Sequence, residues 1–312
     1  MITSTFTFTD QDNIKIFVYK WEPDYKPKAI VQILHGLVEH AKRYTRVAEV
    51  LCKEGYICYA DDHRGHGLTA GDLTEATLEG NAGVLGPNGW KGVVTDIHEL
   101  SKIVKKEHPN LPLFLVGHSW GAMLAYDYIQ EWGNEISGCV LSGTNGKSNK
   151  SALQEGIKST NSEMKKLGPT APSKLRTFKS LNMSWQDDEG ATGFEWLSRD
   201  KGEVQKYVDD PWCGFNTPDT LWLELSKGNE KIYDIENEKK IPKDLPIFLI
   251  SGSLDPVGNN TLGIKAMVNR LKEYNIKDVS YKLYKDARHE VFNEINRDEV
   301  FKDLVNWLNS HI

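Results

Sequence analysis

The stretch that decides the fold spans residues 113–121 and reads LFLVGHSWG. Its first four residues are apolar and predict a buried strand, and a helical pattern begins directly after it. Gly117, Ser119 and Gly121 form the G-x-S-x-G pattern of a nucleophilic serine at a sharp strand-to-helix turn. Glycine on both sides leaves room for the strained turn, and the helix directs its free N–H groups toward the serine. Ser119 is therefore the candidate nucleophile.

Length and charge limit the class of protein. A chain of 312 residues with 26% charged residues predicts a soluble globular protein of one large domain, or of one domain with a sizeable insertion. The net charge of -6 argues against nucleic acid as a partner and against electrostatic attraction to anionic lipid surfaces. No apolar stretch approaches the ~20 residues that span a bilayer, so no stable membrane insertion is expected.

The cysteines and the first residues predict where the protein works. Cys52, Cys58, Cys139 and Cys213 show no C-x-x-C spacing, and two of them lie inside apolar strand-like runs. Buried free thiols are the simplest interpretation, and they indicate a reducing compartment. The N-terminus lacks the basic segment and the apolar segment of a signal peptide. The sequence therefore predicts a cytoplasmic protein.

Strand-like and helix-like segments alternate along most of the chain. Residues 5–9 and 14–21 alternate polar and apolar residues and predict an opening hairpin. Further strands are expected at 30–34, 56–60, 113–116, 138–141, 247–250 and 279–284, and helices at 41–54, 90–107, 120–132, 262–274 and 297–308. This alternation predicts an α/β fold with a doubly wound, mostly parallel sheet, whose last strand lies at an edge.

One long stretch interrupts the alternation. Residues 144–243 contain no convincing strand, and a structureless loop of that length is improbable in a compact domain. We therefore predict a helical cap insertion within a core formed by residues 1–143 and 244–312. The cap should lie over the carboxyl ends of the strands, where α/β sheets bind ligands.

Two later loops supply partners for Ser119. Asp255 follows the apolar run that ends at Ile250, and His289 follows the strand that ends near Tyr284. All three side chains are then expected at the carboxyl edge of the sheet, in the order serine, aspartate, histidine that α/β-hydrolases use. In such a triad His289 accepts the serine proton and Asp255 orients the imidazole.

Other acids and bases fit less well. Asp286 stands three residues before His289, so its side chain would have to turn back on its own backbone. His98 and His108 lie on or just past a solvated helix, and His311 is next to the end of the chain.

Acyl transfer also requires two N–H donors for the developing oxyanion. The residue after the nucleophile, Trp120, supplies one of them. The loop after the first parallel strand supplies the other, the N–H of Leu37, and Gly36 permits the tight turn there. We interpret His35 as a structural histidine that fixes this loop.

Metal and cofactor motifs are missing from the sequence. His289-Glu290 is not followed by a histidine at zincin spacing, and residues 117–121 carry no phosphate-loop lysine. No G-x-G-x-x-G precedes an acid at dinucleotide-binding spacing. No cofactor and no metal is expected.

With these residues placed, the chain resembles the monoacylglycerol lipase and lysophospholipase group of serine α/β-hydrolases. The resemblance covers nearly the whole chain. It rests on HGLVEH at 35–40, DHRGHG at 62–67, GHSWG at 117–121, GSLDPVG at 252–258 and RHEVFNE at 288–294. In the insertion, WLSRD at 196–200 and YVDDP at 207–211 resemble the cap of bacterial members. The resemblance implies the same roles as the residues themselves: Ser119 as nucleophile, Asp255 as acid, His289 as base, and Leu37 and Trp120 as oxyanion donors.

The resemblance implies a carboxylic ester hydrolase that acts on a small-molecule acyl ester, a monoacylglycerol or lysophospholipid, through an acyl-enzyme intermediate. Val38 stands where the family often has glycine, which concerns the shape of the site rather than the mechanism. Aromatic cap residues could line an acyl tunnel, although more than half of them should form the cap's own core. The tunnel candidates are Trp185, Trp196, Trp212 and Phe215. Transient contact of the cap with a lipid surface is compatible with this interpretation.

Alternative functions stay open. A serine aminopeptidase of the same fold would need acidic cap residues to hold a free α-amine. Glu155, Glu163, Asp187, Asp188 and Glu189 are present but are interpreted as solvated charge. A general carboxylesterase or thioesterase would differ only in its substrate. A binding protein on this fold is disfavoured because all three triad residues are present.

Overall fold

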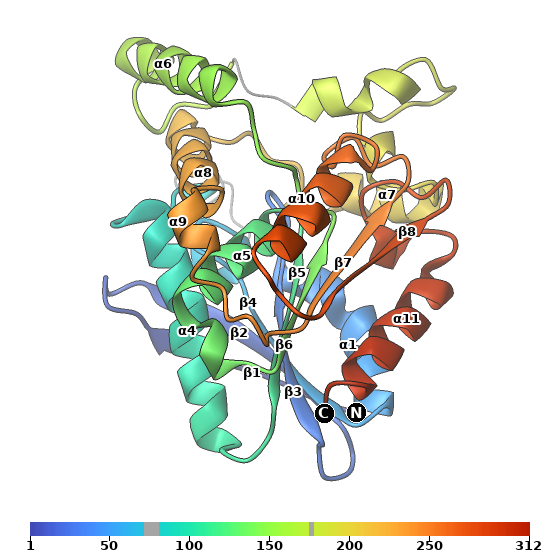
Figure 1. Ribbon diagram of the computed structural model, residues 1–312. Helices are drawn as coiled ribbons and strands as arrows, with labels where there is room; N and C mark the ends of the chain where they lie inside the picture. Colours follow the sequence, from blue (N-terminus) through green and yellow to red (C-terminus); the bar gives the residue numbers. More distant parts are fainter. Residues whose placement is uncertain (72–80, 175–177) are drawn as a thin grey trace.

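The computed structural model describes residues 1–71, 81–174 and 178–312. Within them, a central eight-stranded sheet has the order β1-β2-β4-β3-β5-β6-β7-β8 (Figure 1). The strands are β1 (Ile2–Thr9), β2 (Lys15–Glu22), β3 (Ala29–Leu34), β4 (Tyr56–Asp61), β5 (Leu113–His118), β6 (Gly138–Ser142), β7 (Ile247–Gly252) and β8 (Val279–Tyr284). The pairs β1–β2 and β2–β4 are antiparallel, and the remaining pairs from β4 to β8 are parallel. The predicted hairpin and doubly wound sheet are confirmed.

Helices cover both faces of this sheet (Figure 1). One face carries α4 (Gly89–Glu107), α5 (Trp120–Trp132) and α10 (Leu262–Glu273), and the other carries α1 (Thr45–Lys53) and α11 (Arg297–Asn309). Short helices η1 (Ala41–Tyr44), α2 (Gly67–Ala70), η2 (Gly133–Glu135) and η5 (Val291–Asn293) lie in the connections. Along β5, Leu113 and Leu115 join one apolar cluster, whereas Phe114 and Val116 join the other. This alternation lets every residue of the strand be buried.

A long segment of helices, here called the β6–β7 insertion (residues 143–246), separates β6 from β7. It contains α6 (Lys150–Leu167), η3 (Phe178–Trp185), η4 (Glu195–Leu197), α7 (Lys201–Asp209), α8 (Asp219–Ile232) and α9 (Ile235–Glu238). Figure 1 shows α6 and η3 standing at the top, beyond the carboxyl ends of β5 to β7. In contrast, α8 packs against α4 and α5 and thereby extends the helical layer of the core.

The insertion has a small apolar core of its own. Trp196, Leu197, Tyr207 and Cys213 are buried together, with Phe178, Leu181, Trp185 and Phe194 packed around them. Among the described residues, no helix is both long enough and apolar enough to cross a bilayer. All four cysteines are buried free thiols.

Candidate active site

The turn between β5 and α5 holds Ser119 in a strained backbone conformation. Its φ of 54° and ψ of -117° lie outside the regions that serine ordinarily adopts. A Cβ atom on Gly117 would lie 2.4 Å from the carbonyl oxygen of Gly121, and one on Gly121 would lie 2.2 Å from that of Leu34. Only glycine fits at either position. The Ser119 N–H donates to the Ser142 carbonyl at 2.8 Å, which ties the turn to β6.

Asp255 and His289 meet at the ends of the next two strands. Asp255 follows β7 and is fully buried, and His289 follows β8 with 1% of its surface exposed. The His289 Nδ1–H donates to both carboxylate oxygens of Asp255, at 3.0 Å each. The carboxylate also accepts from the Ser251 hydroxyl at 3.1 Å and from the Val257 N–H at 2.9 Å. These bonds orient the acid toward the imidazole.

His289 and Ser119 line one cavity, but no hydrogen bond joins the serine hydroxyl to the imidazole in this structure. Catalytic hydrogen bonds are commonly loose before substrate binds. Asp286, the other acid near His289, is exposed, and its own N–H donates to Ser253 Oγ at 2.8 Å. The other histidines that were considered as the catalytic base form hydrogen bonds to other residues: His98 to Glu135, His108 to Tyr59 and His311 to Asp278.

The electrostatic surroundings of His289 shift its proton affinity. Burial alone lowers the pKa of the imidazole, but the Asp255 carboxylate opposes this. With Glu290 and Glu39 adding to the effect of Asp255, the pKa of His289 is raised above its usual value. The imidazole therefore keeps its proton to a higher pH than a free histidine does.

We expect kcat/KM to rise with pH through one ionisation with a midpoint above ~6.5, because only neutral His289 accepts the serine proton. Asp255→Asn removes the charge that raises this pKa, so the midpoint should fall and kcat should drop by about 10²-fold or more. A pH–rate profile of each variant measures both effects. Asp286→Asn is the matched control and should change neither the midpoint nor kcat. If Asp286→Asn lowered kcat more than Asp255→Asn does, Asp286 would be the acid of the triad.

The loop after β3 lies beside Ser119. A Cβ atom on Gly36 would lie 3.3 Å from the Ser119 Cβ, and Leu37 lines the same cavity as Ser119. His35 Nδ1–H donates to the Gly36 carbonyl at 2.7 Å, while its Nε2 accepts from the His63 N–H at 2.9 Å. Because the C=O of Gly36 and the N–H of Leu37 belong to one trans peptide and point in opposite directions, His35 fixes the direction of that N–H.

Two features fit the oxyanion-binding role that the sequence predicts for Leu37 and Trp120. The Trp120 N–H stands at the first position of α5, where a helix offers no intrahelical acceptor. Burial, reinforced by the neighbouring His63 and His66, holds the pKa of His35 well below its usual range. His35 therefore stays neutral and keeps the tautomer that orients Leu37.

A buried ion cluster joins this loop to the His289 loop. Arg43 forms hydrogen bonds to Glu39 and, at 2.7 and 2.8 Å, to both oxygens of Glu290. Glu39 also accepts from the Gly36 N–H at 2.5 Å and from the Tyr44 hydroxyl at 2.8 Å. Burial raises the pKa of Glu290, but Arg43 outweighs it and holds the value at about 2. Sequence reasoning missed this cluster, although its residues lie within or beside the HGLVEH and RHEVFNE motifs.

The cavity at Ser119 is small and covered by aromatic side chains. Its volume is about 30 Å³, which corresponds to roughly one water molecule and is too small for an acyl chain. The ring of Trp196 lies 5.0 Å from that of His289, and Phe178 stacks on Trp196 at 5.9 Å. The residues that line this cavity are Gly36, Leu37, Val38, Glu39, His118, Ser119, Phe178, Trp196, Leu197, Tyr207, His289 and Glu290.

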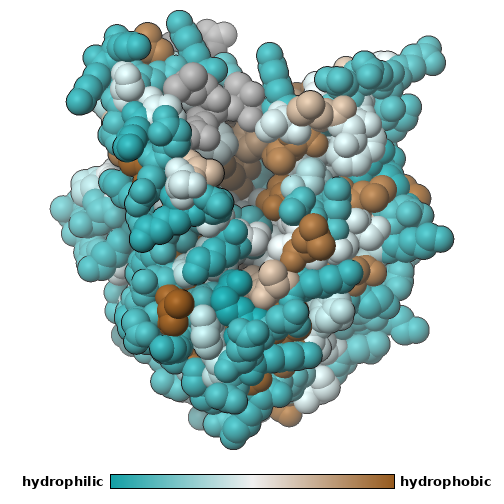
Figure 2. All heavy atoms as spheres, turned by 45° about the horizontal axis from the view of Figure 1, so that its top comes forward, coloured by the Kyte–Doolittle hydropathy of each residue, from teal (hydrophilic) through white to brown (hydrophobic). Residues whose placement is uncertain are grey.

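Only one of the four proposed tunnel residues, Trp196, lines this cavity. The Trp185 ring instead packs on the Arg288 guanidinium at 4.5 Å, and Phe215 packs on His66 at 5.5 Å. Trp212 lines a separate cavity. Phe178, which lies 5.9 Å from Trp196, belongs to the cover as well. Figure 2 shows apolar side chains gathered in a hollow between the two raised parts of the surface.

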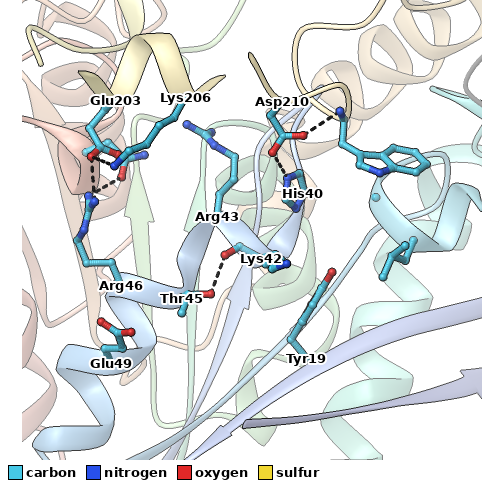
Figure 3. A pocket seen from close by; sticks show the side chains of 14 residues that line it. Tyr19, His40, Lys42, Arg43, Thr45, Arg46, Glu49, Glu203, Lys206 and Asp210 are labelled. Carbon is cyan, nitrogen blue, oxygen red and sulfur yellow. Dashed lines mark hydrogen bonds and ion pairs between the residues drawn. The ribbon is translucent and has the colours of Figure 1, made fainter. Parts of the chain in front are cut away.

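The separate cavity has a volume of about 670 Å³, and Arg43 is among the residues that line it (Figure 3). There Glu203 pairs with Arg46 at 2.9 Å and with Lys206 at 2.8 Å. Among the described residues, one group offers three potential metal ligands within 4.8 Å of one another: His40, Asp210 and Cys213. His40 already bonds Asp210 at 2.8 Å, and the charge of Arg43 acts on both Asp210 and Cys213. That positive charge opposes a cation, and we assign the group no role.

A family model described as "Serine aminopeptidase, S33" matches residues 25–296. The chain belongs to this family. The monoacylglycerol lipase of Mycolicibacterium smegmatis is 28% identical over 326 residues that cover 100% of both chains. These matches confirm the resemblance stated from the motifs, and the protein is a serine hydrolase.

Solved structures agree with the family assignment. A thermostable carboxyl esterase from Bacillus coagulans, in complex with glycerol, superposes with a TM-score of 0.87 at 29% identity, over 100% of this chain and 99% of that one. A lipase in its open form has a TM-score of 0.86 at 28% identity, with 99% of each chain covered. The α/β-hydrolase fold is thus confirmed.

Proposed function

We propose that this protein hydrolyses carboxylic esters of single-chain acyl lipids, monoacylglycerols or lysophospholipids. The observation that carries the proposal is the strained Ser119 beside the buried Asp255–His289 pair, under a cover of apolar aromatic side chains. The monoacylglycerol lipase of M. smegmatis, matched over the whole chain, supports the same substrate class.

In the proposed mechanism, the Ser119 oxygen attacks the ester carbonyl while His289 accepts its proton. The N–H groups of Leu37 and Trp120 stabilise the oxyanion of the tetrahedral intermediate. Protonated His289, stabilised by Asp255, then gives its proton to the leaving alcohol. A water molecule, activated by the same imidazole, releases the fatty acid from the acyl-enzyme.

We propose that residues 144–243 act as a cap that moves to admit substrate. Phe178 and Trp196, both from this segment, line the small cavity at Ser119, and these side chains must move if the cavity is to take an acyl chain. The apolar hollow in Figure 2 offers a place for such a chain once the cover opens. A relative solved as a lipase in its open form supports this movement.

The aminopeptidase alternative would need a free acid at the site, and the described lining of the cavity offers none. The carboxylates that line the described cavity are Glu39 and Glu290, and both are engaged by Arg43. Of the acidic residues in the cap, Asp188 and Glu189 line another cavity, and Glu163 accepts from the Lys174 N–H at 3.0 Å. Among the described residues that line this cavity, an α-ammonium group would therefore find no uncompensated carboxylate to bind.

Each methylene added to the acyl chain should favour the transition state by up to ~0.8 kcal/mol until the apolar site is full. We expect kcat/KM to climb from acetyl toward medium or long monoacyl esters, measured on p-nitrophenyl esters and then on monoacylglycerols and lysophospholipids. Triacylglycerols should be poor substrates because the cap admits one chain more readily than three. Ser119→Ala serves as the blank. A preference for acetyl esters, or brisk cleavage of prolyl arylamide, would contradict the lipid proposal.

We also propose a cytoplasmic location and transient contact of the cap with lipid surfaces. Four buried free thiols fit a reducing compartment. Within the cap, Leu167 is 40% exposed and Met183 is 64% exposed, so apolar side chains are available to a lipid surface. Flotation with neutral lipid vesicles, compared with Met183→Ser, tests the contact.

A further inference from the structure

Val38 directly follows the proposed oxyanion donor Leu37 and has an unusual backbone conformation. Its φ of +51° lies in the left-handed region. A β-branched residue is a genuine outlier there because its branched side chain crowds its own backbone. A residue in this state returns to an ordinary conformation unless its surroundings hold it. The positive φ also explains why glycine suits this position in the family.

The β6–β7 insertion supplies the groups that hold Val38. Its carbonyl oxygen accepts a hydrogen bond from the Tyr207 hydroxyl at 3.0 Å and another from the Gly214 N–H at 2.9 Å. Tyr207 lies on α7 and is 3% exposed, and its ring packs against the Arg43 guanidinium at 4.9 Å and the Phe194 ring at 5.0 Å. The hydroxyl is thus fixed by packing on both sides.

Gly214 is suited to its position by its lack of a side chain. Its φ is +63°, and a Cβ atom would lie 3.0 Å from Phe194 and 3.2 Å from Tyr207. The same N–H also approaches the Tyr207 oxygen at 3.1 Å. Backbone N–H and tyrosine hydroxyl therefore converge on one carbonyl.

The donor Leu37 is fixed from two sides. On its N-terminal side, the core binds Gly36, through Glu39 at the N–H and His35 at the carbonyl. On its C-terminal side, the insertion binds Val38. The insertion likewise binds the base loop, because the Trp196 carbonyl accepts from the His289 N–H at 3.2 Å. The seated insertion thus contacts both halves of the site.

We propose that Tyr207 and the Gly214 N–H are positioning groups for the oxyanion hole. They hold Val38 in its left-handed conformation, and this places the Leu37 N–H where the oxyanion forms. The hole is then complete only while α7 and residue 214 are seated, so the part of the cap that moves to admit substrate is the part that carries Phe178 and Trp196, and any movement of α7 has to be reversed before the oxyanion forms. The inference rests on the role proposed above for Leu37.

Tyr207→Phe tests this directly because it keeps the ring and removes only the hydroxyl. We expect kcat to fall about five- to tenfold, as for loss of one hydrogen bond, with KM changed less than about twofold. Inhibition by a long-chain trifluoromethyl ketone, which forms an oxyanion on Ser119, should weaken by a similar factor. Binding of an uncharged ether analogue and the pH midpoint set by His289 should not change.

Tyr233→Phe is the matched control. Tyr233 is also 3% exposed and donates to a backbone carbonyl, that of Asn145, at 2.6 Å. Its loss should leave kcat and ketone affinity within about twofold of the parent. If kcat and ketone affinity fell equally in both variants, Tyr207 would have only a structural role. If Tyr207→Phe bound the ether analogue more weakly, Tyr207 would be a substrate contact. Either result overturns the proposal.

The double variant with Val38→Gly gives the sharpest outcome. Glycine adopts a positive φ without strain, so the hydroxyl has less to hold in place. We expect Tyr207→Phe to lower kcat by less than about twofold in the Val38→Gly background. An undiminished effect there would contradict the role of strain at Val38.

The rate at which a fluorophosphonate modifies Ser119 separates this proposal from the proposed function. That reaction develops charge in the same hole whatever the natural substrate is. Slower modification of Tyr207→Phe supports the positioning role even if lipid esters prove poor substrates. An unchanged rate of modification contradicts the positioning role even if lipid esters prove good substrates.

Discussion

Ser119→Ala should lower ester turnover by about 10³-fold or more, and His289→Ala should do the same. Without the serine oxygen no acyl-enzyme forms, and without the imidazole the serine keeps its proton. Because the two residues act as one unit, the double variant should be scarcely worse than either single variant. Steady-state kinetics on one ester, with all three variants purified in the same way, measures this.

The non-additivity is the informative part of that experiment. Residues that acted independently would multiply their effects, so a double variant about 10³-fold below each single variant would contradict a shared step. His311→Ala is a suitable control because His311 pairs with Asp278 on the surface, away from Ser119. It should retain full activity.

Arg43→Met should lower the free energy of unfolding by about 3–5 kcal/mol at pH 7. The substitution leaves Glu39, 2% exposed, and Glu290, 5% exposed, as buried carboxylates without their cation. It should also lower kcat, since Glu39 holds Gly36 and Glu290 adjoins His289. Chemical denaturation followed by fluorescence measures the loss of stability.

The difference in unfolding free energy between the parent protein and Arg43→Met should become smaller as the pH falls. Arg43 lowers the pKa of Glu290 to about 2, so the pair stabilises the folded state above the unfolded pKa of ~4.3. This stabilisation is lost as the pH falls toward 2, and the gap between parent and variant should narrow over that range. Lys277→Met removes an exposed partner of Asp244 and should cost less than about 1 kcal/mol at any pH. A gap that widened in acid would contradict the ion-pair explanation.

Local patterns predicted the fold well because they are set by short segments. The helix expected at 120–132 coincides with α5, and the strand expected at 279–284 coincides with β8. The carboxyl edge of a parallel sheet also collects the loops after successive strands, so the positions of Asp255 and His289 followed from their strands alone.

Contacts between distant segments were beyond the sequence patterns. Nothing in the spacing shows that Arg43 pairs with Glu290, or that the Tyr207 hydroxyl reaches the Val38 carbonyl. The apolar pattern of the insertion does not show which residues pack in the insertion's own core and which line the site. Trp185 and Trp212 were therefore as good candidates for the acyl tunnel as Trp196. The packing of α8 on α4 and α5 was hidden for the same reason.

The most direct test of the proposed lipid esterase is covalent labelling of the whole protein with a long-chain fluorophosphonate. Peptide mass spectrometry locates the adduct, and monoacylglycerol or prolyl arylamide is added as competitor. We predict one adduct per chain, on the peptide that contains Ser119, formed more slowly with monoacylglycerol and at an unchanged rate with the arylamide. An adduct on another residue, or protection by the arylamide alone, would contradict the account.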